Sequence, residues 1–137
     1  MKNAICTSVG VVGSLLASFF GGWTASLTTL IIFMGIDLLT GWVLAGVFHK
    51  SPKTETGALE SRTGFKGLIR KLTILLFVLI GYRLDVAVGT TYIRDAICIA
   101  FMANELLSIV ENAGLMGIPI PAVITEAIDI LKKKKIE

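Results

Sequence analysis

The chain has 137 residues, of which 17% are charged and 54% hydrophobic, and its formal net charge at pH 7 is +3. The charged fraction lies well below the roughly 25% of an average soluble domain, and the mean hydropathy is +0.80. These values argue against a cytosolic enzyme, a nucleic-acid-binding module and a disordered linker. Residues 3–36 carry no charge, and a membrane-spanning helix requires only about 20 apolar residues. The sequence therefore predicts an all-α integral membrane protein.

The uncharged segment is too long for one ordinary spanning helix, and it divides at Gly21-Gly22. A glycine pair is costly within a helix and suits a tight turn, and Trp23 follows, a residue type that favours the membrane–water interface. We predict a first span over about residues 4–20 and a second over about residues 23–48. The amino terminus also resembles a secretory signal, but apolar character continues through the second span, which favours a retained helix.

A basic segment separates this first hairpin from a second one. Residues 49–66 are predicted to form a loop. Lysine and arginine accumulate on the cytoplasmic side of membrane proteins, so this basic loop is expected in the cytoplasm. Apolar runs then predict a third span over about residues 67–88 and a fourth over about residues 92–113, so that about four transmembrane helices form two hairpins. The second hairpin is rich in charge for two spans, and it either crosses the membrane fully or lies partly in the interface.

The remaining chain is predicted to be a cytoplasmic tail, residues 117–137, following a transmembrane domain over residues 1–116. Pro121 can open a helix, and Ile124, Ile128 and Leu131 form an apolar stripe along it. We expect this amphipathic helix to lie on the cytoplasmic membrane surface or against a neighbouring subunit.

The orientation follows from two basic clusters, at residues 50–71 and 132–135. Both clusters lie on the same side of the membrane only if an even number of spans separates them. Two spans satisfy this condition, place both termini in the cytoplasm, and bring Trp23, Tyr82 and Tyr92 together at the outer interface. The basic residues expected at the cytoplasmic surface, facing lipid, are Arg62, Lys66, Arg70, Lys71, Lys132, Lys133, Lys134 and Lys135.

Asp37 is the single charged residue of the predicted second span. A carboxylate near the bilayer centre costs about 2.5–3.5 kcal/mol on insertion scales, so it should face protein or water. At about 1.5 Å per residue, Asp37 and Glu105 lie at nearly the same depth below the outer ends of their spans. Two roles stay open: the acids line a pore or bond between subunits, or they fix the pairing of helices.

Other polar and small residues support contact between helices. The fourth span carries a polar stripe at helical spacing, which predicts subunit contact or a water-filled path. The first two spans are rich in glycine, alanine and serine, which permit close helix approach and oligomerisation. The candidates for pore lining or subunit contact are Asp37, Thr40, Glu105, Ser108 and Asn112.

No catalytic motif is present: the sequence has no HExxH, GxSxG, phosphate loop or Cys–His pair. Cys6 and Cys98 lack metal-ligand spacing, and His49 is the single histidine. We therefore expect no enzymatic activity, no catalytic residues, no cofactor, no metal site and no nucleic-acid partner.

Three blocks in order resemble the small holins of phage lysis and toxin secretion. "DLLTG" at residues 37–41 is similar to the family's Asp-x-x-Thr-Gly, and "SRTGFKGLIRK" at residues 61–71 resembles its basic segment. "NELLSIVENAGLMGIPIP" at residues 104–121 is similar to its Asn-Glu-x-x-Ser-x-x-Glu-Asn block, which is the most specific of the three.

The resemblance implies that subunits accumulate in the bacterial cytoplasmic membrane, assemble as homo-oligomers within the lipid bilayer, and open lesions. It also implies a functional partnership with a cell-wall hydrolase or a large exported toxin that passes through these lesions. Two alternatives stay open: a small four-span transporter, and a membrane-anchoring structural subunit. A transporter commonly carries a carboxylate in its first span, and this chain has none there.

Overall fold

The computed structural model describes the backbone of residues 1–136 and the side chains of residues 1–134. Within this range the protein contains helices and connecting loops, and no strand, which confirms the all-α prediction. The helices are α1 (Lys2–Phe19), α2 (Ala25–Gly46), α3 (Ser61–Val88), α4 (Ile93–Leu115) and α5 (Ala122–Ile136).

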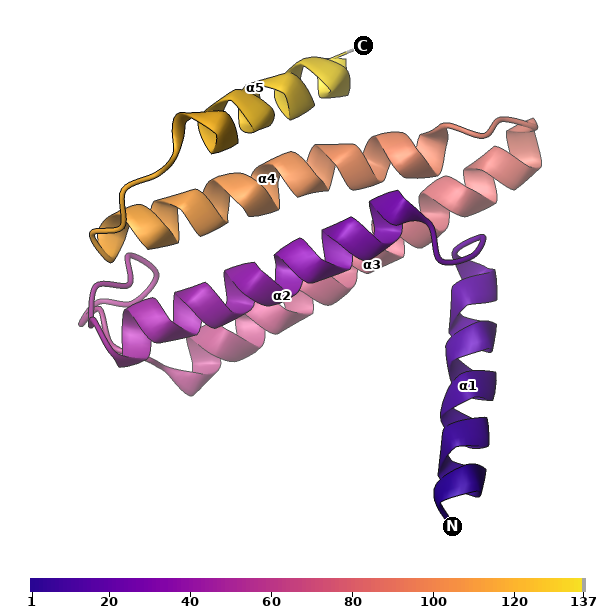
Figure 1. The fold of residues 1–137 in the computed structure, drawn as a ribbon, viewed down its shortest axis with the longest axis horizontal. Helices are drawn as coiled ribbons and strands as arrows, with labels where there is room; N and C mark the ends of the chain where they lie inside the picture. Colours follow the sequence, from indigo (N-terminus) through magenta and orange to yellow (C-terminus); the bar gives the residue numbers. More distant parts are fainter. Residues whose placement is uncertain (137) are drawn as a thin grey trace.

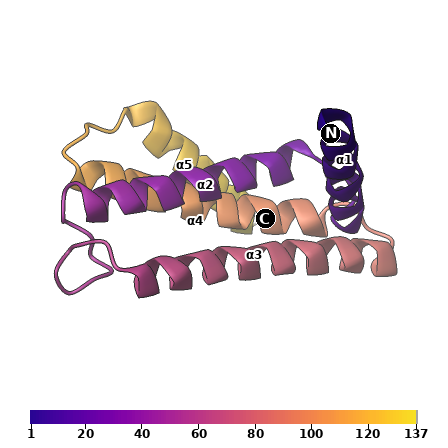
Figure 2. The ribbon, with the colours of Figure 1, turned by 90° about the horizontal axis from the view of Figure 1, so that it is seen from below.

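Helices α2, α3 and α4 lie side by side, each antiparallel to the next in the chain (Figures 1 and 2). α4 is central, because it contacts α2, α3 and α5, whereas α2 and α3 touch each other over a smaller area. Two helices, α1 and α2, are long and apolar enough to cross a membrane. α3 and α4 are of similar or greater length but carry more charged residues.

The helices begin and end near the predicted spans, with one clear difference at α3. The basic segment 49–66 was expected to be a loop, but α3 begins at Ser61, so only its first part lacks helical structure. Glu60 is extended and precedes the helix, and no proline or positive-φ residue interrupts the chain between Ser61 and Val88. The helical backbone therefore continues into the basic segment.

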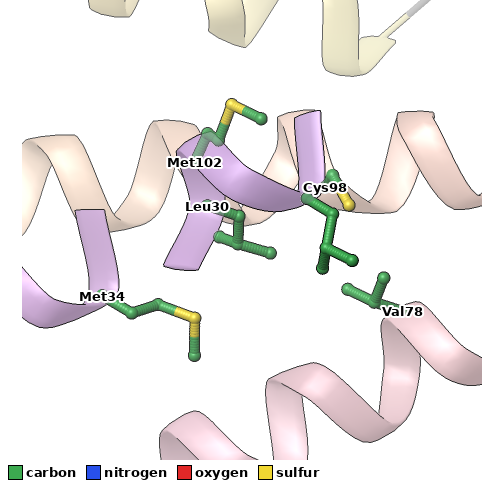
Figure 3. Packing of buried hydrophobic residues seen from close by; sticks show 6 residues of the cluster. Leu30, Met34, Val78, Cys98 and Met102 are labelled. Atoms are coloured by element: carbon green, nitrogen blue, oxygen red, sulfur yellow. The ribbon is translucent and has the colours of Figure 1, made fainter. Parts of the chain in front are cut away.

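The apolar core lies between the three helices in the half nearer the α3–α4 turn. Figure 3 shows side chains of α2, α3 and α4 meeting there. The buried members are Leu27, Leu30 and Met34 of α2, Val78 of α3, and Cys98 and Met102 of α4. They recur at helical spacing, which is why one face of each helix turns inward.

Helix α1 points away from the other helices, so the expected first hairpin is open (Figure 1). The α1–α2 turn uses Gly21 and Gly22, both at positive φ, where a glycine adopts the left-handed region at low cost. A guanidinium Nη1 of Arg94 donates to the carbonyl oxygens of Phe20 and Gly21, at 2.8 and 3.3 Å. These hydrogen bonds hold only the carboxyl end of α1, and most of its side chains are exposed.

Helix α5 runs back along α4, on the side away from α3 (Figures 1 and 2). Its stripe residue Ile128 is only 4% exposed, and Leu131 borders the same apolar groove as Thr29 and Met102. The tail was expected on the membrane surface or against another subunit, but here it packs against α4 of its own chain. An apolar stripe buries its surface against the nearest apolar face, and α4 supplies one.

Candidate functional site

Lys71 of α3 joins the other two central helices through its ammonium group. Its Nζ lies 2.6 Å from Oδ2 of Asp37 on α2 and 2.6 Å from Oε2 of Glu105 on α4. The three side chains are 12%, 8% and 9% exposed, respectively. One buried cation is therefore shared by two buried carboxylates, and each charge comes from a different helix.

The helical periodicity that builds the apolar core also places these charges. On α2 the buried stripe runs from Leu30 through Met34 to Asp37, and on α4 it runs from Cys98 through Met102 to Glu105. These steps of three and four residues keep each side chain on one helical face. The inward faces are thus apolar towards the α3–α4 turn and polar in the other half of the bundle.

Asn112 extends the polar contacts by about two further turns of α4 beyond Glu105. Its Nδ2 donates to Oδ1 of Asp37 at 3.3 Å and to Oγ1 of Thr40 at 3.0 Å. The Thr40 hydroxyl donates in turn to the backbone carbonyl of Asp37 at 3.1 Å. We call these five residues the Lys71 cluster: Asp37, Thr40, Lys71, Glu105 and Asn112. Every buried side-chain polar atom in the described residues has a hydrogen-bond partner.

Most of the predicted site residues lie either in or beside the Lys71 cluster or on the exposed basic surface. Asp37, Thr40, Glu105 and Asn112 meet in the Lys71 cluster, and Ser108 lines the cleft beside it. Exposed residues at the expected basic surface are Arg62, Lys66 and Arg70 on α3 and Lys132, Lys133 and Lys134 on α5. The side chain of Lys135 lies outside the described residues.

Lys71 was grouped with the lipid-facing cations in the sequence, and the structure instead places it between the two acids. A signal for this position exists, since Lys71, Ile74 and Val78 follow one another at steps of three and four residues. Val78 is fully buried and Ile74 packs against the core. Lys71 is therefore the first inward position of the α3 stripe, although it directly follows exposed Arg70.

A cleft of about 690 Å³ adjoins the Lys71 cluster. Residues of α2, α3, α4 and the α2–α3 loop line it, and Asp37, Lys71 and Glu105 are among them. The cluster is therefore buried between the helices on one side and borders a hollow on the other.

A second polar cluster, the Asp85 cluster, lies at the end of the bundle formed by the α3–α4 turn. Oδ1 of Asp85 accepts from Oγ1 of Thr90 at 2.6 Å and from the backbone N–H of Ile93 at 2.9 Å. Its Oδ2 accepts from the backbone N–H of Arg94 at 2.9 Å. The Asp85 carboxylate thereby satisfies the first amide groups of α4, which lack partners within the helix. These contacts give the Asp85 carboxylate, one of the charges of the second hairpin, a structural role.

No group of three His, Cys, Asp or Glu residues in the described part of the chain is arranged to hold a metal ion. The ion pairs of Lys71 link α2, α3 and α4.

Comparison with known proteins gives consistent matches along the chain. The sequence profile of the bacteriophage holin family matches residues 14–133. An uncharacterised protein of Halalkalibacterium halodurans is 36% identical over 138 residues, covering 96% of both chains. An uncharacterised protein of Clostridium perfringens is 34% identical, covering 95% of this chain and 93% of its own. A probable holin of Bacillus phage phi105 is 28% identical, covering 84% and 80%. No solved structure is significantly similar.

Proposed function

The chain belongs to the bacteriophage holin family, and from this membership we propose that its copies oligomerise in the bacterial cytoplasmic membrane and permeabilise it. The lesion releases a cell-wall hydrolase or a large toxin, which is the partner that the family resemblance implies. Helices α1 to α4 each cross the membrane in the proposed topology, and both termini lie in the cytoplasm.

The observation that carries the proposal is the Lys71 cluster. Burying an ion in an apolar medium costs several kcal/mol unless it is paired, so a membrane protein retains such ions where they serve a purpose. In a single copy Lys71 forms ion pairs with both Asp37 and Glu105, and these pairs link three helices. When copies assemble, the helices separate and the same groups turn to water at the wall of the lesion.

Helix α1 supplies the surface for assembly. Nearly all of its side chains are exposed, and nothing lies within 4 Å of the positions where Gly10 and Gly13 would carry a Cβ. Small residues on an unpartnered apolar helix permit another helix to approach closely, which drives association within lipid. A second copy therefore packs on α1, where this chain leaves the contact open.

Insertion requires α5 to leave its place along α4. Leu131 borders the same groove as Thr29, near the start of α2, so the following lysines lie level with the outer half of the spans. Lysine within the apolar layer is costly, up to about 2.5–3.5 kcal/mol per residue at its centre on insertion scales. On the cytoplasmic membrane surface the same lysines contact anionic lipid, and the face of α4 under α5 becomes free for a neighbouring copy.

The position of the tail is tested by labelling. Lys133→Cys is combined with Cys6→Ser, which removes the exposed native thiol, and cells are treated with a membrane-impermeant maleimide. Labelling is expected in inverted membrane vesicles and not in intact spheroplasts, assayed before permeabilisation. Labelling from the outside of spheroplasts would contradict cytoplasmic termini.

The function itself is tested by inducing this chain alone in bacteria and following dye uptake and potassium loss. The native chain is expected to permeabilise the membrane abruptly after a delay. Asp37→Asn and Glu105→Gln are expected to shift the delay, while the exposed acids serve as controls in Asp129→Asn and Glu111→Gln. An intact membrane at high, membrane-inserted expression would rule out self-sufficient pore formation and favour transport or anchoring.

A further inference from the structure

We propose that the cleft beside the Lys71 cluster binds the phosphate headgroup of an anionic phospholipid. The cleft lies between α2, α3, α4 and the α2–α3 loop, and we call it the basic cleft. Its volume of about 690 Å³ falls within the roughly 300–1,000 Å³ of small-molecule sites. The proposal needs the protein to lie in a membrane, and it holds whether or not the protein opens a lesion.

The charges that line the basic cleft favour an anion. Lys53, Lys66 and Arg70 are exposed there, and none of them forms an ion pair with a described residue. Two of the three lining acids, Asp37 and Glu105, are bound to Lys71. Glu60 is the one lining acid without such a partner, so free cations outnumber free acids in this part of the chain.

The backbone adds to this preference at the start of α3. The N-terminal residue positions of a helix carry amide groups without intrahelical acceptors, and the helix dipole favours negative charge there. The side chain of Glu60 makes no capping hydrogen bond to these amides, and Thr63 and Gly64 line the cleft beside them. A phosphate oxygen can therefore accept from backbone and side-chain donors together.

The rest of the lining is apolar and suits the glycerol and first acyl carbons of a lipid. Trp42, Leu59 and Phe101 line the cleft. The indole Nε1 of Trp42 lies 3.5 Å from the point where a Cβ would stand if Gly64 carried a side chain. Tryptophan prefers the headgroup level of a membrane, where its ring contacts apolar carbons and its N–H contacts polar groups. A soluble phosphate ion would use the cations alone and leave this apolar wall uncovered.

Trp42 also provides the reporter, since the chain has two tryptophans and the other can be removed. Full-length Trp23→Phe protein is placed in phosphatidylcholine vesicles that contain a small fraction of lipid with brominated chains. Brominated phosphatidylglycerol is expected to quench Trp42 at least twice as strongly as brominated phosphatidylcholine at the same fraction. Lys66→Gln/Arg70→Gln is expected to abolish this preference, whereas the charge-matched Lys132→Gln/Lys133→Gln is expected to retain it.

Three results would overturn the proposal. The first is equal quenching by the two brominated lipids, and the second is equal loss of preference in the cleft and tail variants. The third is full displacement by millimolar glycerol phosphate, which would assign the cleft to soluble phosphates. The reciprocal Trp42→Phe protein, in which Trp23 reports from the other end of α2, is expected to show no lipid preference. Circular dichroism of each variant confirms that its helices are intact, and dye release from the same vesicles separately tests pore formation.

Discussion

Buried acids lie at two levels of the bundle formed by α2, α3 and α4, and they are held in different ways: Asp85 lies at the α3–α4 turn, and Asp37 and Glu105 lie midway along α2 and α4. Asp85 accepts hydrogen bonds from residues only five to nine positions away in the sequence, and its donors are one hydroxyl and two backbone amides. Asp37 and Glu105 are each 34 positions from Lys71 and bind a full charge on another helix. The Asp85 cluster therefore shapes a turn within one hairpin, whereas the Lys71 cluster decides whether separate helices stay together.

This difference matters for the proposed function, in which copies first accumulate and then open a lesion. Local contacts around Asp85 can persist through any rearrangement of the helices, because the turn moves as one unit. The ion pairs of Lys71 break when α3 separates from α2 and α4. Substitutions in the Asp85 cluster should therefore change stability alone, whereas substitutions in the Lys71 cluster should also change the onset of permeabilisation.

The largest effect is expected from Lys71→Met. The substitution leaves two buried carboxylates without a cation, and breaking a buried ion pair costs about 3–5 kcal/mol. We expect a loss of that order in the free energy of unfolding in detergent, together with a marked change in the onset of dye uptake. Lys133→Met removes an exposed lysine of α5 and is expected to change the free energy of unfolding by less than about 0.5 kcal/mol.

A smaller loss is expected from Asp85→Asn. The amide keeps one acceptor oxygen but cannot serve all three donors of the Asp85 cluster, and the loss of a helix cap costs about 0.5–2 kcal/mol. Unfolding in detergent measures this loss. At matched membrane levels the onset of dye uptake should equal that of the native chain. A shift as large as that of Lys71→Met would remove the distinction between the Asp85 cluster and the Lys71 cluster.

Glu105→Gln should affect stability least and timing clearly. The amide oxygen can still accept from Lys71, and Lys71 and Asp37 then form a one-to-one pair, so unfolding should change by no more than about 1 kcal/mol. The onset of dye uptake should nevertheless shift, because the charge balance of the cluster has changed. Glu111→Gln, an exposed acid on the same helix, should leave the onset unchanged.

Much of the helical layout could be predicted from the sequence. The apolar run before Asp37, the glycine pair after Phe20 and the basic segment after Phe48 place α1 and α2 within a few residues. The loop was predicted to continue to about residue 66, whereas α3 begins at Ser61, so the beginning of α3 was predicted a few residues too late. The equal depth of Asp37 and Glu105 followed from residue counting alone.

The parts that the sequence did not reveal depend on contacts between elements. Lys71 directly follows a run of exposed cations. That Lys71 faces inward is shown only by Val78, which lies two turns further along the same face of α3 and is buried. The direction of α1 depends on the geometry of the Gly21-Gly22 turn, and the residues of α1 itself do not reveal it. The apolar stripe of α5 predicts which face of that helix is buried. It does not predict that the partner is α4, because that depends on which apolar face lies nearest in the folded chain.

The most direct test of the central claim is a double-mutant cycle on Lys71 and Glu105. Onset of dye uptake is measured for the native chain, Lys71→Met, Glu105→Gln and the double variant at equal membrane levels. If the two side chains act through one ion pair, the double variant should be delayed or advanced no further than the larger single change. Independent shifts that multiply in the double variant would show that Lys71 and Glu105 act separately, and would contradict a shared cluster that controls opening.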